Sequence, residues 1–371
     1  METLTELKHT LRAAGQADPA SALSMPAAFY TSPEVLKLEE DRIFRAEWIC
    51  LGRIDDVPNP GDYFTAQLLN EPLLVIRGDD SKIRVLSNVC RHRGMTLASG
   101  CGSIKRRIVC PYHSWSYSAD GKLVNAPRME DVKGFDIATK RLPEFASEIW
   151  RGFIYVNLDG KAAPLAPRLA GLEPYIDKYH MEEMNKYNGG ETTWQTNWKC
   201  LIENFTEGYH IAFTHPKSIN PILPMQRNEK IPGGTGYTGY RANQTPNLPL
   251  RGAFPPDATE IELRSSMIFC IYPSQLVALS NTATSISVRP LGVDSVELHW
   301  DKMSYAKSLT AEQQATAMAY FDTYMNEDRE MVESVQRGNH SHHMERCELG
   351  PENLIAGVVS DFYRYLSQRL L

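Results

Sequence analysis

Two short segments of the chain each carry a cysteine that is closely followed by a histidine. The first segment is Cys90-Arg91-His92 and the second is Cys110-Pro111-Tyr112-His113, with 17 residues between them. Thiolates and neutral imidazoles are both ligands of iron in proteins. Two tight turns brought face to face would therefore offer four ligands, with the two thiolates on one iron and the two imidazoles on a second one.

This division of ligands is that of a Rieske [2Fe-2S] centre, and two other interpretations compete with it. Chance predicts only on the order of 10⁻⁴ matches to such a template in a chain of this composition. A zinc finger places two cysteines before two histidines and carries the second pair on a helix, whereas here each half is Cys then His in strand-like sequence. The predicted cluster ligands are Cys90, His92, Cys110 and His113. Trp115 and Tyr117 either cover the cluster or are ordinary core aromatics.

A second pair of histidines, His210 and His215, lies five residues apart. Composition alone predicts about 0.3 such pairs by chance, so the spacing is a weak signal. A five-residue step turns a side chain by about 140° on a regular helix, so the rings converge only if the helix ends between them. Pro216 disfavours the α conformation at His215 and supplies that ending. With one carboxylate, the pair would form a 2-His-1-carboxylate triad that leaves positions open for dioxygen on a mononuclear Fe(II).

The segments 90–94 and 110–115 resemble the signature of the Rieske non-haem iron oxygenases, also called ring-hydroxylating oxygenase α subunits. The resemblance covers about residues 25 to 340. It implies an α+β fold: a small all-β Rieske domain, and a larger catalytic domain with an antiparallel β-sheet flanked by helices, of the helix-grip type.

The resemblance also points to residues around the second iron. Asp328 resembles the third iron ligand because it stands five residues before Glu333 in a run that matches the family, and its neighbour Glu327 is the rival assignment. From the residues alone, any of the many carboxylates could serve. Asn204 is expected beside the metal as a catalytic residue, and Tyr209 either supports the site or packs in the core.

Glu207, three residues before His210, is the second predicted catalytic residue. In the family this residue is usually Asp, and it bridges a cluster histidine of one subunit to a metal histidine of the next. The resemblance therefore implies that Glu207 links His113 of one chain to His210 of another; a salt bridge on a helix surface is the alternative. A glutamate resembles the branch with choline, glycine-betaine and carnitine oxygenases, although that branch often has Cys where this chain has Gly208.

The resemblance implies a terminal oxygenase in which the Rieske cluster passes electrons to the mononuclear iron. No nucleotide-binding, flavin or plant-type ferredoxin pattern is found, so we expect electrons from NADH or NADPH through a separate ferredoxin or flavin reductase. A bridge between subunits implies a homotrimer. The expected reaction is monooxygenation of a small organic substrate by C–H hydroxylation or oxidative N-dealkylation. The alternatives are cis-dihydroxylation of an aromatic ring and, more distantly, a non-catalytic Rieske redox carrier.

The elements that must position these residues are read from periodicity and turn signals. Residues 1–44 are expected to form an arm ending in a helix from Pro33, residues 45–160 the Rieske domain, and residues 161–371 the catalytic domain. Alternating runs predict strands at 63–69, 73–77, 83–87, 107–117 and 152–157. Within the catalytic domain we expect a helix over 194–213, loops over 217–260, strands over 267–305, a helix from Thr310 to about Gly338, and another over 354–371.

The substrate pocket is expected to be lined from residues 217–310. The aromatic candidates are Tyr237, Tyr240, Phe254, Phe269, Tyr272 and Trp300. Their faces suit either an alkylammonium or a flat aromatic ring. The candidate partners of a substrate carboxylate are Arg227, Arg241, Arg251 and Arg264.

Composition narrows the possible partners of this 371-residue chain. Lys and Arg number 39 against 45 Asp and Glu, and the net charge of −6 without long runs of like charge makes nucleic acid and anionic membranes poor partners. Neither a signal peptide nor an apolar run of membrane-spanning length is evident, so we expect a cytoplasmic protein. Seven cysteines spread over the chain do not resemble a disulfide framework.

Overall fold

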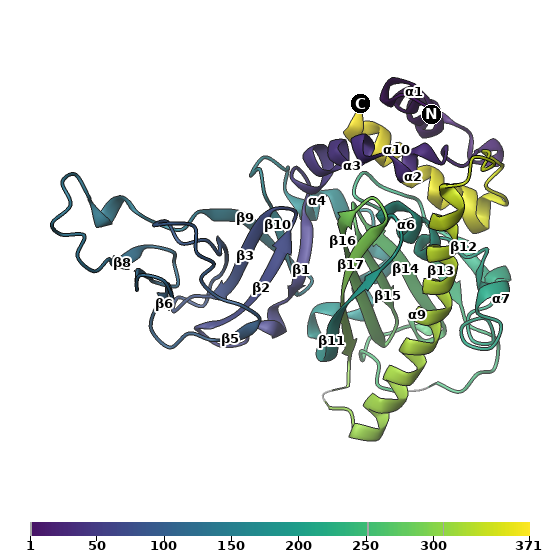
Figure 1. Cartoon of the computed structure of the whole chain (residues 1–371). Coiled ribbons are helices and arrows are strands. Elements are labelled where there is room, and N and C mark those ends of the chain that lie inside the picture. Colours follow the sequence, from purple (N-terminus) through teal and green to yellow (C-terminus); the bar gives the residue numbers. More distant parts are fainter. Residues whose placement is uncertain (1, 251, 307) are drawn as a thin grey trace. The chain divides into compact units, whose positions relative to one another are not determined.

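The computed structural model describes residues 2–250, 252–306 and 308–371, and it contains two compact units (Figure 1). The smaller unit is Cys50–Ala162, and the larger unit joins the residues up to Ile49 with Ala163–Leu371. All seven cysteines are free. None of the described helices is both long and apolar enough to cross a membrane.

The smaller unit consists of two antiparallel sheets. The first has the strand order β1-β10-β9-β4-β3-β2-β5, and the second is β6-β7-β8. The strands are β1 (Ile49–Arg53), β2 (Asp62–Leu68), β3 (Glu71–Arg77), β4 (Ile83–Ser87), β5 (Cys101–Ser103), β6 (Ile108–Val109), β7 (Ser116–Tyr117), β8 (Leu123–Asn125), β9 (Glu144–Trp150) and β10 (Phe153–Asn157), with 3₁₀ turns at Ile54–Asp56 and Ile137–Thr139. The all-β prediction is confirmed. The single strand predicted over 107–117 is wrong, because a turn separates β6 from β7.

One hydrophobic core holds the two sheets of this unit together. It contains aliphatic side chains of β3 and β4, such as Leu74 and Leu86, together with Ile108 of β6 and Leu123 of β8. The same core includes Cys90, Cys110, Trp115 and Tyr117. The thiols and aromatic rings of the predicted iron-sulfur site are therefore packed into the hydrophobic core.

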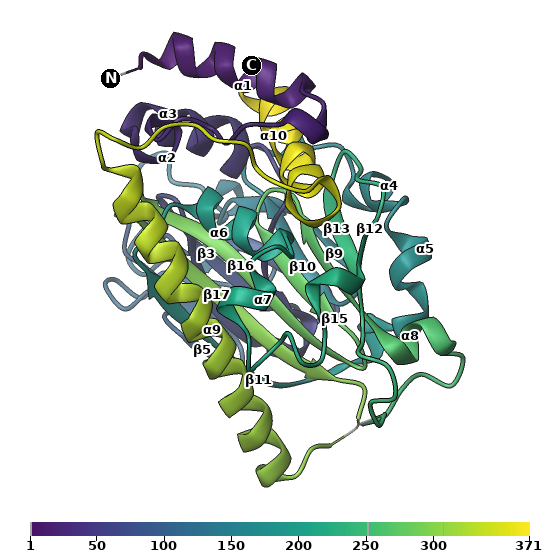
Figure 2. The same cartoon turned by 90° about the vertical axis from the view of Figure 1, so that its right-hand side faces the viewer.

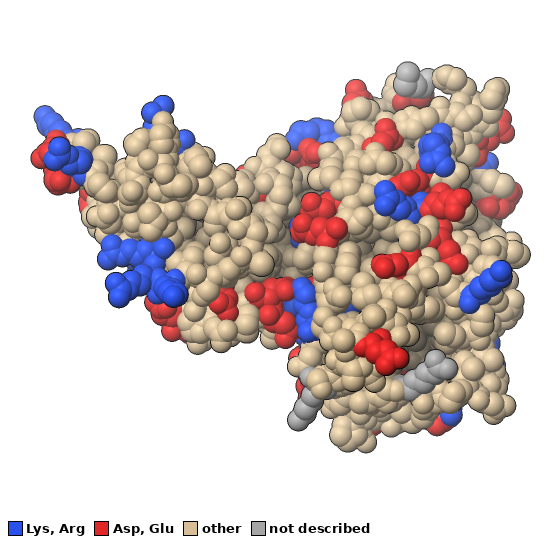
Figure 3. All heavy atoms as spheres, turned by 60° about the horizontal axis from the view of Figure 1, so that its bottom comes forward, with Lys and Arg blue, Asp and Glu red and all other residues tan. Residues whose placement is uncertain are grey.

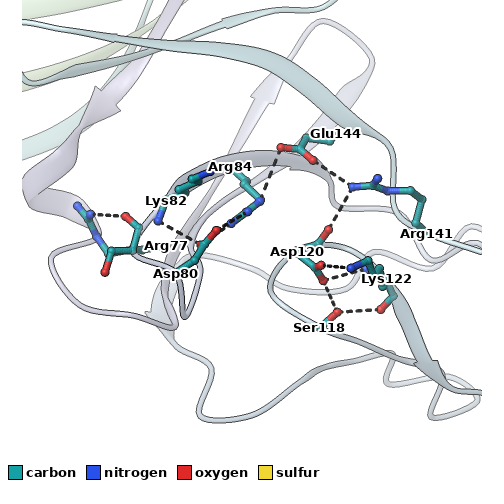
Figure 4. Close-up of polar contacts among 10 residues, drawn as sticks. Arg77, Asp80, Lys82, Arg84, Ser118, Asp120, Lys122, Arg141 and Glu144 are labelled. Atoms are coloured by element: carbon teal, nitrogen blue, oxygen red, sulfur yellow. Dashed lines mark hydrogen bonds and ion pairs between the residues drawn. The ribbon is translucent and has the colours of Figure 1, made fainter.

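Ion pairs tie the turns of the smaller unit to its strands (Figure 4). Arg84 on β4 forms a two-pronged contact with Asp80 at 2.7 and 2.8 Å, and its hydrogen bonds hold the pKa of Asp80 well below its usual range. Arg141 donates to Glu144 on β9 at 3.1 Å and to the Asp120 carbonyl at 3.3 Å. These exposed contacts fix turn geometry more than they add stability, because exposed ion pairs contribute little.

The larger unit is a seven-stranded antiparallel sheet with helices against it, as predicted. Its strand order is β11-β17-β16-β15-β14-β13-β12. The strands are β11 (Asn185–Trp194), β12 (Asn228–Lys230), β13 (Tyr237–Asn243), β14 (Ser265–Ile271), β15 (Gln275–Leu279), β16 (Thr282–Gly292) and β17 (Ser295–Ser304). β12 and β13 lie where loops were predicted; β13 is paired along its whole length with β14, so tertiary pairing overrides its turn-rich sequence.

Ten helices are described in this unit. They are α1 (Leu4–Gln16), α2 (Ala28–Thr31), α3 (Pro33–Glu39), α4 (Leu165–Leu169), α5 (Glu173–Ile176), α6 (Trp198–Thr206), α7 (Ile211–Thr214), α8 (Glu260–Arg264), α9 (Ala311–Asn339) and α10 (Gly357–Leu370). Shorter 3₁₀ or π turns lie at Pro19–Ser21, Glu40–Phe44, Asp177–Tyr179, Met181–Glu183, Met225–Arg227 and Glu352–Ala356. Figure 2 shows α6, α7 and α9 in front of the strands. Helix α6 contacts β14, β15 and β16, and α9 contacts α6 and β11.

The longest helix starts where its capping signal predicts. Thr310 accepts a hydrogen bond from the Gln313 amide at 3.2 Å, and the Gln313 side chain accepts one from the Thr310 amide at 2.8 Å. This capping box satisfies two amides that the first turn leaves unpaired. The predicted helix over 194–213 is wrong as one element, because α6 ends at Thr206 and the chain is extended at Glu207.

Candidate metal centres

The two cysteine turns of the smaller unit are built alike. In each, the cysteine amide donates to the carbonyl five residues further on at 2.8 Å, and the cysteine carbonyl accepts from the amide four residues on at 3.1 Å. That fourth residue is Gly94 in one turn and Ser114 in the other, and both have positive φ, +74° and +59°. The same backbone pattern therefore presents each of the two cysteines, Cys90 and Cys110.

The imidazoles of the two turns meet on the surface of the unit. The Nδ1 atoms of His92 and His113 lie 3.2 Å apart, and the ring of His92 stacks on Trp115 at 4.7 Å between centroids. Both histidines are exposed, whereas Cys90 and Cys110 are buried beneath them. Partial desolvation of the ring and the neighbouring His113 lower the pKa of His92, which favours the neutral ring that a metal requires.

Tyr117 lies directly against one of the thiols. Its hydroxyl is 3.3 Å from Cys90 Sγ and accepts a hydrogen bond from the Arg91 amide at 2.9 Å. Burial raises the pKa of Tyr117 far above its usual range, so the hydroxyl stays protonated and can donate to a thiolate. Two cysteine sulfurs beneath two imidazoles fit a [2Fe-2S] cluster with mixed ligands.

In the larger unit, His210 and His215 flank the four-residue helix α7. His210 is the residue before its first turn and His215 the residue after its last. The ring centroids are 5.2 Å apart. The predicted convergence of the two rings occurs, and it depends on two interruptions: one at Glu207 before His210, and the one at His215 that Pro216 was expected to supply.

A carboxylate of α9 lies between the two rings. Asp328 Oδ1 is 3.0 Å from His215 Nε2 and 3.5 Å from His210 Nε2. The three candidate ligand atoms all lie within 4.8 Å of one another. Asn204 of α6 donates to Asp328 Oδ1 at 3.0 Å, so the predicted Asn204 does contact the predicted carboxylate.

Two further carboxylates lie on the other side of the rings. Glu207 Oε1 is 2.5 Å from Nδ1 of His210, and Glu327 Oε2 is 2.7 Å from Nδ1 of His215. Each carboxylate can accept a hydrogen bond from the Nδ1–H of its ring, which leaves the Nε2 lone pair free to bind a metal beside Asp328. Burial lowers the pKa of both rings, but these carboxylates and Asp328 outweigh it and raise the pKa of each overall. Two imidazoles and one carboxylate, with the outer nitrogens occupied, fit a facial Fe(II) triad.

Glu207 also stabilises the break between α6 and α7. Its carboxylate accepts hydrogen bonds from the amides of Tyr209 and His210, which satisfies amides at the start of α7. Glu207 is not on a helix, contrary to the prediction, and Tyr209 is exposed. A Cβ at Gly208 would meet the amide end of the Asn228 side chain, so the Cys that the resemblance suggested at this position would require that side chain to turn aside.

A cavity of about 240 Å³ opens beside the three candidate ligands, which form part of its wall. Its aromatic lining is Tyr187, Phe205, Tyr240, Tyr320 and Tyr324, and Lys302 contributes an ammonium group. Of the six aromatics predicted to line the pocket, only Tyr240 does so among the described residues. Phe254 lines a separate cavity. The other four aromatic side chains pack elsewhere in the unit. Phe269 and Tyr237 are buried, Tyr272 stacks on Tyr365, and Trp300 packs on Phe321.

None of the three predicted arginines that the structure describes lines this cavity. Arg241 lies 3.8 Å from Glu229, and Arg264 donates to Glu260 and to a backbone carbonyl. Arg227 ends a 3₁₀ turn, and Arg251 lies outside the described residues. The sequence did contain a signal for the lining residues of α9 that were not predicted. Ala317, Tyr320 and Tyr324 lie three and four residues apart on the helix face that also carries Asp328.

Sequence comparison places both units among known proteins. Residues 47–136 match the Rieske [2Fe-2S] domain, and residues 173–366 match the ring hydroxylating alpha subunit (catalytic domain). The second match covers more than half of the chain. The chain belongs to the ring-hydroxylating α-subunit family. It is a Rieske non-haem iron oxygenase, with a [2Fe-2S] cluster and a mononuclear iron as cofactors. Members of this family act on small substrates with dioxygen and receive electrons from a separate reductase.

Individual relatives lie on the branch that Glu207 suggested. The carnitine monooxygenase oxygenase subunit of Acinetobacter baumannii is 29% identical over 328 residues, which cover 87% of this chain and 86% of the relative. The glycine betaine monooxygenase oxygenase subunit of Chromohalobacter salexigens is 35% identical over 221 residues, 60% of this chain and 49% of that protein. The structure of the quaternary ammonium Rieske monooxygenase CntA superposes with a TM-score of 0.86 at 26% identity, covering 97% of this chain and 98% of that one.

Proposed function

We propose that this oxygenase hydroxylates a carbon next to the nitrogen of a small N-alkylated substrate, after which the product breaks down by oxidative N-dealkylation. The reaction consumes one dioxygen, two electrons and two protons; one oxygen atom enters the C–H bond and the other leaves as water. The resulting carbinolamine releases an amine and a carbonyl compound. The relatives that act on carnitine and glycine betaine support this assignment, as does the glutamate at position 207.

The geometry supports specific residues as cofactor ligands. We assign Cys90 and Cys110 to one iron of the cluster and His92 and His113 to the other. His210, His215 and Asp328 are the proposed ligands of the mononuclear iron, because their ligand atoms converge while carboxylates occupy the outer nitrogens of both rings. In this proposal the N-terminal arm is 1–44, the Rieske domain 45–160 and the catalytic domain 161–371.

Ferrous iron at the triad would supply the binding and reductive activation of dioxygen. The residues of the chain set its surroundings. Asn204 holds Asp328 Oδ1, and Glu207 and Glu327 fix the tautomer and orientation of the two rings. The lining of the cavity around them, with side chains such as Phe205, Ile211 and Ile268, is largely apolar and excludes bulk water from the reacting carbon.

We further propose that electrons enter the mononuclear site from the cluster of another copy, with Glu207 as the bridge between His113 of that copy and His210. The exposure of His113 and the Glu207–His210 contact support this route. A report on a related quaternary ammonium monooxygenase describes inter-subunit electron transfer for that protein. A head-to-tail ring of three chains would supply each bridge once, and we propose that this homotrimer works in the cytoplasm, where NADH and NADPH are available.

A substrate panel tests the reaction. The reconstituted enzyme is given a surrogate reductase, NADH and a set of N-methylated acids and aromatic acids, with ¹⁸O₂ as oxidant. We expect NADH consumption coupled to loss of an alkyl group from an N-alkylated substrate. Entry of both labelled atoms into one aromatic ring would instead establish a dioxygenase. A Rieske spectrum without substrate-dependent oxygen uptake would establish a redox carrier.

A further inference from the structure

The cavity beside the proposed iron ligands contains one buried ammonium group. Lys302 lies on β17, lines the cavity and is only 7% exposed. Its Nζ is 2.6 Å from the hydroxyl of Thr284, its cross-strand neighbour on β16, and 5.0 Å from the ring centroid of Phe321. Among the described residues, no carboxylate forms an ion pair with Lys302.

Other buried or half-buried lysines of the same unit do have acidic partners. Lys199 pairs with Glu39 at 2.7 Å, and Lys230 pairs with Asp361 at 2.8 Å. An unpaired ammonium in a protein interior is costly, which is why buried charges are nearly always paired. Burial lowers the pKa of Lys302 to about 8, so the ammonium remains the main form at neutral pH. The fold thus keeps a cation beside the substrate space without a partner of opposite charge.

We propose that Lys302 binds a carboxylate of the substrate and so selects substrates that carry one. This inference rests on the proposed function and specifies its substrate class: a small N-alkylated carboxylic acid. A carboxylate that enters the cavity would form a charge-assisted hydrogen bond with Nζ in a site of low dielectric constant. An amide of the same shape leaves the ammonium without a counter-charge, and a substrate with only a cationic group is repelled by it.

The polar groups around Lys302 favour one orientation of such a substrate. Thr284 already accepts from Nζ, and the Tyr324 hydroxyl lies 3.4 Å from the Thr284 hydroxyl. A carboxylate at Nζ therefore meets hydroxyl groups on β16 and α9. The iron ligands His210 and Asp328 line the same cavity, so the alkyl and amino part of the molecule occupies the remaining space next to the iron.

Binding measured without turnover tests this role. The probes are two matched pairs: γ-butyrobetaine with its primary amide, and hexanoate with hexanamide. Within each pair only the charge of one end changes, and the second pair lacks the ammonium. Titration calorimetry on the intact holoenzyme gives the ratio of affinities for the wild type, for Lys302→Met, and for Lys217→Met, which removes an exposed lysine that does not line the cavity.

We expect the wild type and Lys217→Met to bind each carboxylate at least about tenfold more tightly than its amide, the size of one charged hydrogen bond. In Lys302→Met the ratio should fall to about one for both pairs, while the melting temperature stays the same or rises because a buried charge is gone. A ratio near one in the wild type, absence of binding by all four probes, or an unchanged ratio in Lys302→Met overturns the proposal. If Lys302→Met does not fold, the ratio of carboxylate to amide affinity in the wild type alone tests the proposal. Because no turnover is measured, failure here leaves the dealkylation assignment intact.

Discussion

The two candidate metal centres of this chain are built in opposite ways. The proposed cluster ligands come from two turns within residues 90–113, and the histidines of these turns are exposed. The proposed iron ligands come from the two ends of α7 and from α9, with His215 fully buried and Asp328 113 residues further along the chain. The first centre depends on local backbone geometry, whereas the second exists only after the larger unit has folded.

On the face shown in Figure 3, basic side chains gather on the smaller unit, whereas acidic and basic ones are interspersed on the larger unit.

Removing one ligand from each centre gives the largest effects and tests whether the centres are independent. Asp328→Ala should abolish turnover and lower iron from about three to about two atoms per chain, with the Rieske spectrum unchanged. Cys110→Ala should abolish the spectrum and leave about one iron. Metal analysis and visible spectroscopy check both. Loss of both centres in either variant would contradict the separation.

The carboxylate behind His215 should have a smaller effect than the one in front of it. Glu327→Gln keeps the shape but removes the charge that orients the ring, and we expect iron affinity to fall about 10- to 100-fold. Added Fe(II) should restore turnover. Glu330→Gln, an exposed position on the same helix, is the control. If added iron fails to rescue Glu327→Gln while Asp328→Asn retains iron, then Glu327 is the ligand.

At the cluster, the corresponding supporting contact is the Tyr117 hydroxyl. A hydrogen bond to a ligand sulfur stabilises the more negative reduced cluster. Tyr117→Phe removes one bond of about 1 kcal/mol, which corresponds to a potential lower by on the order of 40 mV for one electron. Spectroelectrochemistry measures the shift. Tyr112→Phe, at an exposed tyrosine in the turn that carries Cys110, should leave the potential unchanged; equal shifts in both variants would argue against the Tyr117 contact.

The likeness of the two cysteine turns predicts a pair of small, opposite effects. Ser114→Gly should stabilise the smaller unit by up to about 1 kcal/mol, because serine is strained at positive φ. Gly94→Ser should destabilise it by about the same amount, since a Cβ there meets no atom within 4 Å and only the backbone conformation matters. Denaturant midpoints at full cluster occupancy check both. A change of the same sign in both variants would show that the turns are not equivalent.

The same contrast explains what the sequence could predict. The spacing of Cys90, His92, Cys110 and His113 and the capping box at Thr310 are local signals, and the corresponding turns and helix start are where they indicate. The prediction of the cavity lining is mostly wrong, because Tyr187, Phe205 and Tyr324 reach the cavity from three elements that come together only in the folded unit. Glu327 was considered only as a rival ligand. Its place behind His215 depends on how α9 is rotated, which helical periodicity alone does not fix.

One face of α9 carries both cavity-lining side chains and a proposed iron ligand. Ala317, Tyr320 and Tyr324 contact the cavity one after another, and Asp328 follows one turn later on the same rigid rod. We therefore expect a molecule that displaces the tyrosines far enough to tilt α9 to move the Asp328 carboxylate as well. In that case a substrate that fits poorly would disturb the proposed iron site before any chemistry begins.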